Sequence, residues 1–119
     1  MSVKTQESGW GVNSMILYLE LKDAIVRILR DRAKQRRTIY YSELGAALAI
    51  PAQGPWKPIL DEISREETSA GRPDITYLVV SKTTNLPGQI GFTAAKPPST
   101  QQTKRALETI EAVFDHYNK

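Results

Sequence analysis

The segment TIYYSELGAALAIPAQGPWKPILDEISREETSAG, residues 38–71, carries the order of elements that decides the fold. It opens with a β-prone run, Thr38–Tyr41, because isoleucine and tyrosine favour extended backbone. Ser42 then predicts the N-cap of a short helix, Glu43–Ala49. Prolines and a glycine cluster at residues 50–55, which predicts a loop.

A longer helix is expected after this loop, from about Pro58 to Ala70. Gly71 is placed as its C-terminal stop, because glycine adopts the left-handed conformation that commonly ends a helix. Apolar residues at helical spacing predict its buried stripe. The stripe consists of Ile59, Leu60 and Ile63.

An amphipathic helix is expected before the segment, from about Ser14 to Arg37. Its apolar stripe comprises Leu17, Leu21, Ala24, Ile25, Ile28 and Leu29. Residues 1–13 are polar without periodicity and predict a flexible N-terminal tail. Residues 14–119 are then expected to form a single domain, in keeping with a length of 119 residues.

Beyond the segment, β-branched and aromatic residues over Ile75–Ser81 predict a strand. Residues 85–88 predict a turn, and Gln89–Ala94 a returning strand, so that the two strands form a hairpin. Ser99, with a glutamine three residues later, predicts a capping box at the start of a last helix. The core-facing stripe of that helix is expected to be Leu107, Ile110, Val113, Phe114 and Tyr117.

The order helix, short strand, two helices and hairpin is that of a winged helix-turn-helix, here with an added C-terminal helix. We therefore expect an α+β, winged-helix-like domain. The string Tyr41-Ser42-Glu43-Leu44 resembles the strand-to-helix entry in the DNA-binding half of alkylguanine-DNA alkyltransferases and alkyltransferase-like proteins. Residues 73–80, PDITYLVV, stand where that family has its active-site strand.

The resemblance implies a DNA-binding frame, with Tyr41 as a candidate contact to the phosphate backbone. It does not imply alkyl transfer, because the chain has no cysteine to accept the alkyl group. The arginine that the family carries on its recognition helix also has no counterpart at Lys57–Leu60.

Composition excludes several kinds of chemistry. Without cysteine there can be no disulfide, thiolate metal site or cysteine nucleophile, and the single histidine, His116, cannot form a histidine-rich metal site. Phosphate loops and serine nucleophile motifs are not found in the sequence. We expect a non-catalytic protein with no metal and no cofactor. The longest apolar run, Met15–Leu19, is too short to cross a bilayer, so no membrane partner is expected. The absence of cysteine favours a cytoplasmic protein.

The net charge of +3 is unevenly distributed. Six basic residues lie between Arg27 and Arg37 against one acidic residue, Asp31. Such a cluster either binds a polyanion or forms the solvated end of a helix. The candidate nucleic-acid-binding residues are Arg30, Arg32, Lys34, Arg36, Arg37, Tyr41 and Lys82.

The expected recognition helix is acidic, which opposes binding to DNA phosphates. Its candidate protein-binding residues are Asp61, Glu62, Glu66, Glu67 and Trp56. They favour a protein-binding module, for example a small inhibitor or immunity-type protein that neutralises a basic, nucleic-acid-directed toxin. The alternatives are a solvated acidic face with Trp56 in the core, and a DNA-binding winged-helix regulator. A homodimer is a further option, through the last helix.

Overall fold

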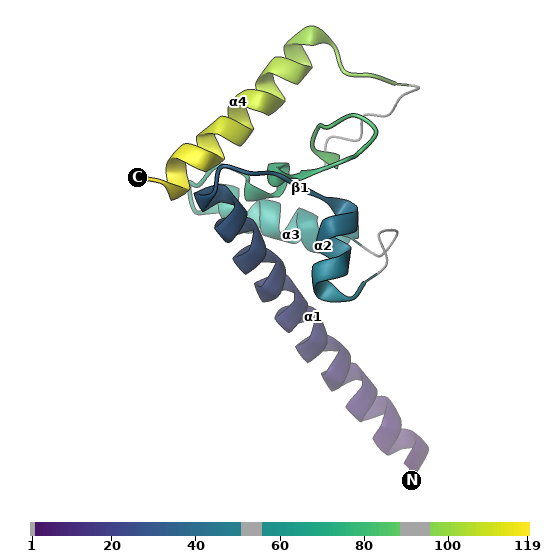
Figure 1. Cartoon of the computed structure of the whole chain (residues 1–119). Coiled ribbons are helices and arrows are strands. Elements are labelled where there is room, and N and C mark those ends of the chain that lie inside the picture. The colour runs from purple at the N-terminus through teal and green to yellow at the C-terminus, as the bar shows by residue number, and fades with distance from the viewer. Residues whose placement is uncertain (1, 51–55, 89–95) are drawn as a thin grey trace.

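The computed structural model describes residues 2–50, 56–88 and 96–119. Within them, four α-helices accompany a two-stranded sheet (Figure 1). The elements are α1 (Ser2–Lys34), β1 (Ile39–Tyr40), α2 (Tyr41–Leu48), α3 (Trp56–Ser69), the 3-10 helix η1 (Ile75–Leu78), β2 (Val79–Val80) and α4 (Thr100–Tyr117). The expected α+β class is confirmed, in that helices and a small sheet occur together.

Helix α1 is longer at its start and shorter at its end than the sequence predicted. It begins at Ser2, so the backbone of residues 2–13 is helical rather than an aperiodic tail. Adding turns to a helix that has already formed carries no new nucleation cost. Residues 2–13 can therefore continue the helix although they have no apolar stripe. The first turns of α1 extend away from the other elements (Figure 1).

A left-handed residue ends each of the first three helices. Arg36 (φ 55°) follows α1, Ala49 (φ 59°) follows α2 and Gly71 (φ 79°) follows α3. In each case the next amide donates to the carbonyl oxygen five residues earlier, as Arg72 N–H does to Glu67 O at 2.9 Å. The predicted glycine stop is confirmed. The expected extension of α1 to Arg37 is wrong, because the chain has already turned at Arg36.

Helix α2 begins two residues earlier than predicted. Its N-cap is Tyr40 rather than Ser42. Glu43 Oε1 accepts a hydrogen bond from Tyr40 N at 3.0 Å, which satisfies an amide at the helix start and fixes the position of the first turn.

The predicted hairpin is wrong. Strand β2 pairs with β1 in parallel, with Ile39 opposite Val79 and Tyr40 opposite Val80. The residues before β2 form η1 because the Asp74 carboxylate accepts hydrogen bonds from Thr76 N and Thr76 Oγ1, a local alternative to strand pairing.

The chain does reverse after β2, but earlier than expected. Ser81 N donates to Leu86 O at 3.0 Å, and Asn85 has a left-handed backbone (φ 58°). A single antiparallel bridge then joins Val80 to Pro87. The expected returning strand at 89–94 lies outside the described residues, as does most of the loop at 50–55.

The core lies where α1, α3, η1 and α4 meet. Ile59, Leu60 and Ile63 are buried, which confirms the stripe of α3. Ile25 and Leu29 of α1 are buried in the core. The side chain of Leu17, also in the predicted stripe, is not among those that the structure describes. The stripe of α4 is confirmed for Ile110, Val113 and Phe114, and Tyr117 is half-buried.

Leu107 is the exception in the predicted α4 stripe, because it is 52% exposed and Ala106 is buried instead. The two residues are about 100° apart around the helix, so Leu107 lies on the flank of the stripe. The capping box at Ser99 and Gln102 is confirmed. No helix in the described part of the chain combines the length and apolarity needed to cross a membrane.

The two left-handed caps at residues 49 and 71 give a paired prediction. Gly71→Ala places a Cβ where the backbone disfavours it, although nothing lies within 4 Å of that atom. We expect the free energy of unfolding to fall by about 1 kcal/mol in urea titrations. Ala49→Gly makes the opposite change at a residue with the same left-handed backbone. Its free energy of unfolding should equal that of wild type or exceed it by up to about 1 kcal/mol. A more stable Gly71→Ala protein would contradict this account of the caps.

Candidate functional site

The acidic residues of α3 are bound by cations of the same chain. Lys22 Nζ, on α1, lies 2.6 Å from Glu62 Oε2 and 2.7 Å from Glu66 Oε2. Tyr18 OH donates to Glu62 Oε1 at 3.1 Å. Two of the candidate protein-binding carboxylates therefore hold α1 and α3 together.

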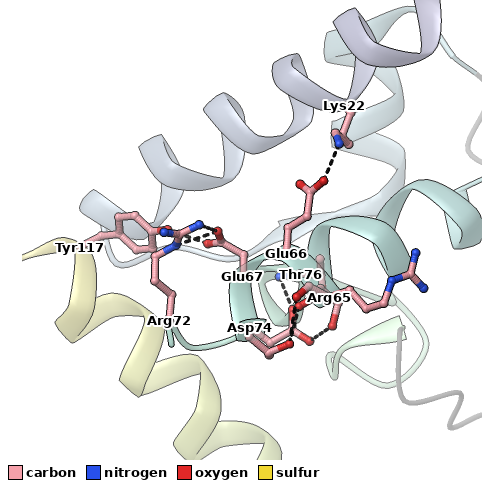
Figure 2. Close-up of polar contacts among 10 residues, drawn as sticks. Lys22, Arg65, Glu66, Glu67, Arg72, Asp74, Thr76 and Tyr117 are labelled. Atoms are coloured by element: carbon pink, nitrogen blue, oxygen red, sulfur yellow. Dashed lines mark hydrogen bonds and ion pairs between the residues drawn. The ribbon is translucent and has the colours of Figure 1, made fainter. Parts of the chain in front are cut away.

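Glu67 has a structural position in the interior. Its side chain is 4% exposed and receives Arg72 Nη2 at 2.6 Å and Arg72 Nε at 2.8 Å (Figure 2). Tyr117 OH, from α4, donates to the other carboxylate oxygen at 2.7 Å. A partner protein could not reach Glu67 without opening this cluster.

The remaining two candidates on α3 are also engaged. Asp61 Oδ2 lies 3.2 Å from Lys57 Nζ, one helical turn away. Trp56 is 7% exposed, and its ring is 6.3 Å from that of Tyr41 in a tilted arrangement. Trp56 therefore closes the core, as the alternative interpretation of the sequence had it, and is not an exposed anchor.

These contacts shift protonation equilibria in consistent directions. The hydrogen bond from Lys22 holds the pKa of Glu62 below its usual range, and Tyr18 adds to this effect. The same contacts, Glu62 first and then Glu66, raise the pKa of Lys22. Burial raises the pKa of Tyr117; the hydrogen bond to Glu67 adds to this, and Arg30 opposes it.

A groove of about 530 Å³, which we call the α1–α3 groove, runs beside these ion pairs. Its cations are Lys22, Arg27, Arg30 and Lys34 of α1 and Arg72 after α3. Arg27, Arg30 and Lys34 follow one stripe of α1 over about 10 Å, and all three are exposed.

The groove also contains carboxylates, but most of them have partners within the chain. Glu66 and Glu67 bind Lys22 and Arg72, and Asp31 accepts a hydrogen bond from Gln35 at 2.9 Å. The fourth is Asp23. The Arg27, Arg30 and Lys34 stripe is consequently the part of the groove best suited to an anionic ligand.

The residues of the predicted basic cluster lie in three different settings. Arg30 and Lys34 line the groove. Arg32 instead donates to Thr38 O at 2.8 Å, and Arg36 binds Asp115 at 2.8 Å and Glu111 at 3.3 Å. Arg37 is exposed but does not line the groove.

Tyr41 and Lys82 do not line the groove either. Tyr41 packs so closely against Gly88 that a Cβ there would overlap its ring, and burial raises the pKa of its hydroxyl. Lys82 Nζ lies 5.5 Å from the centre of the Tyr40 ring. Tyr40 OH in turn donates to Asn85 at 2.9 Å.

Three cations of the groove were missing from the sequence-based candidates: Lys22, Arg27 and Arg72. The spacing of Arg27 from Arg30 and Lys34 was a visible signal, since residues three and seven apart share a helix face. Arg72 gave no comparable signal, because its place depends on how the chain turns after Gly71.

The described part of the chain contains no group of three side chains suited to hold a metal ion. His116 packs edge-on against Tyr117, with 4.8 Å between the ring centres. Neither a family model nor a curated protein nor a solved structure matches the chain.

The Glu67 cluster predicts a large difference between adjacent carboxylates. Glu67→Ala removes the buried acceptor that Arg72 and Tyr117 share, so we expect a loss of about 3 kcal/mol in unfolding free energy. Glu66→Ala is the matched control, because its side chain is 51% exposed, and should cost less than about 1 kcal/mol. Equal losses in denaturant titrations would contradict the structural role of Glu67.

The lowered pKa of Glu62 predicts a pH-dependent contribution to stability. The contribution is complete above the unfolded-state pKa of about 4.3 and is lost as the pH falls through the lower, folded-state value. We therefore expect the stability difference between wild type and Glu62→Gln to be present at neutral pH and to close in acid. Urea titrations at several pH values measure it, and a difference that stays constant in acid would contradict the ion pair.

Proposed function

We propose that this chain is a non-catalytic nucleic-acid-binding module on a winged-helix frame, which contacts a phosphate backbone through the α1–α3 groove. One observation carries the proposal. The carboxylates expected to repel DNA are bound by cations of the same chain, while the exposed stripe of Arg27, Arg30 and Lys34 faces an open groove.

The acidic-face hypothesis fits this geometry less well. A basic partner would have to displace Lys22 from Glu62 and Glu66, and Arg72 from Glu67, before it gained any contact. Of these pairs only that of Glu67 is buried, and breaking it costs several kcal/mol, because the abandoned charge is left without a partner. The same internal cations weaken the electrostatic objection to a nearby phosphate backbone, since three of them offset four carboxylates of α3.

The winged-helix frame is supported by the order of elements. Two helices, α2 and α3, follow strand β1, and the chain reverses after β2 where a wing would begin. The resemblance at residues 41–44 to the DNA-binding half of alkyltransferases agrees with this order. The proposed contact surface nevertheless lies beside α1, at the side of the expected recognition helix.

The stripe predicts the strength and salt dependence of binding. Three cations can neutralise about three phosphates, so the slope of log K against log salt concentration should be about −2.7 on duplex DNA. Binding of this kind does not depend on sequence and should have a dissociation constant of about 10 µM at physiological salt.

Fluorescence anisotropy on a labelled duplex tests the proposal. Arg27→Ala with Lys34→Ala removes two phosphate contacts, and the salt slope should fall to about −0.9. Lys82→Ala with Arg105→Ala is the matched control, because it removes the same charge from exposed residues that do not line the groove. An equal effect of the two double variants would place the DNA elsewhere, and no binding by wild type at low salt would end the proposal.

A carboxylate change separates this proposal from the acidic-face hypothesis. Glu66→Gln releases Lys22 from one partner and removes a negative charge from the groove. We expect DNA binding to become several-fold tighter, since one carboxylate less opposes the phosphates. Weaker binding to DNA would contradict the groove assignment.

A further inference from the structure

Arg72 lies in the α1–α3 groove in a different way from the exposed stripe. Its side chain is 34% exposed and lines the groove, but it is held by the buried carboxylate of Glu67. Nε and Nη2 of Arg72 lie 2.8 Å and 2.6 Å from Glu67 Oε2. A guanidinium carries five N–H donors, so this contact leaves three of them for another acceptor.

The orientation of Arg72 depends on a third residue, Tyr117. Tyr117 OH donates to Glu67 Oε1 at 2.7 Å, so both oxygens of the carboxylate are engaged (Figure 2). The carboxylate cannot rotate away from Arg72 without losing one of these contacts. Because the side chain of Glu67 is only 4% exposed, water does not readily replace them. A chain of contacts that begins on α4 therefore presents Arg72 to the groove.

Arg30 of the stripe lies at the same end of the groove. Burial raises the pKa of the Tyr117 hydroxyl, and the hydrogen bond to Glu67 adds to this effect. Arg30 opposes the rise, since its guanidinium lies near that hydroxyl. Arg30 and Arg72 both line the groove, so a phosphate bound by Arg30 lies within reach of Arg72.

We propose that Arg72 is a further phosphate-binding residue of the groove, and that Glu67 and Tyr117 are its positioning residues. The inference rests on the proposed function and gives this arginine a different task from that of the stripe. The stripe attracts phosphates by its net charge. The charge of Arg72 is balanced by Glu67, and its planar guanidinium instead binds phosphate oxygens by hydrogen bonds in one fixed orientation.

This division predicts that affinity and salt dependence respond to different residues. The salt slope counts the counterions that net positive charge releases from the phosphates, so it depends on the stripe. The pair of Arg72 and Glu67 is neutral and adds little to that slope. The hydrogen bonds of Arg72 should instead change the dissociation constant by the same factor at every salt concentration.

Fluorescence anisotropy of the full chain on the labelled duplex tests the inference. Arg72→Lys keeps the charge but loses the planar guanidinium, so binding should weaken by about fivefold with the slope unchanged at about −2.7. Tyr117→Phe frees one oxygen of Glu67 and loosens the orientation of Arg72. It should weaken binding by about threefold, again without a change of slope.

Tyr18→Phe is the matched control for Tyr117→Phe. It also removes a phenol hydroxyl from a carboxylate of α3, that of Glu62. The cation at that carboxylate, Lys22, is held by Glu66 as well and stays in place. Tyr18→Phe should therefore bind DNA like wild type. Circular dichroism shows whether each variant remains folded.

An NMR signal reports on Arg72 directly. Its Nε–H signal should shift when the duplex is added to wild type, and should shift less in Tyr117→Phe. A purely structural role of Tyr117 would lower stability but leave DNA affinity and this shift unchanged, which overturns the inference. If wild type binds the duplex and Arg72→Lys binds equally well, the inference alone is overturned. If wild type does not bind at low salt, the proposed function is overturned and the inference with it.

Discussion

A carboxylate that is almost out of reach of water, that of Glu67, is the constraint on which the arrangement of the helices depends. A buried charge is tolerated only when it is paired and hydrogen-bonded. Glu67 meets this requirement with Arg72 from the turn after α3 and Tyr117 from the last turn of α4. The cluster therefore joins α3 to α4, while Lys22 joins α3 to α1 through Glu62 and Glu66.

These pairings change how the charges of the chain act on their surroundings. The sequence of α3 is acidic, but in the folded chain its carboxylates are bound by cations from α1, from the following turn and from α3 itself. The basic residues of α1, by contrast, are only partly used in contacts within the chain. Arg32 and Arg36 serve internal contacts, and Arg27, Arg30 and Lys34 remain along an open groove. The exposed cations of α1 that line the groove are therefore Arg27, Arg30 and Lys34.

The sequence predicted the features that depend on neighbouring residues. The glycine stop at Gly71, the capping box at Ser99 and the stripe of α3 all follow from contacts within about five residues, and all were confirmed. The sequence did not show that β2 pairs in parallel with β1, which lies 40 residues earlier. The internal partner of Glu62 was hidden for the same reason, since Lys22 is 40 residues from it. Arg72 and Leu107 lie at positions that only the packed helices define.

The most direct test of this account is to map the bound nucleic acid by NMR on the full chain. Arginine side-chain and backbone amide signals would be followed while a short DNA duplex is added at low salt. The account predicts that Arg27, Arg30, Lys34 and Arg72 shift together, and that Lys57, Asp61 and Arg65 on the outer face of α3 stay in place. Shifts confined to the face with Lys57 and Arg65 would contradict it, because DNA would then contact the outer face of α3 rather than the groove.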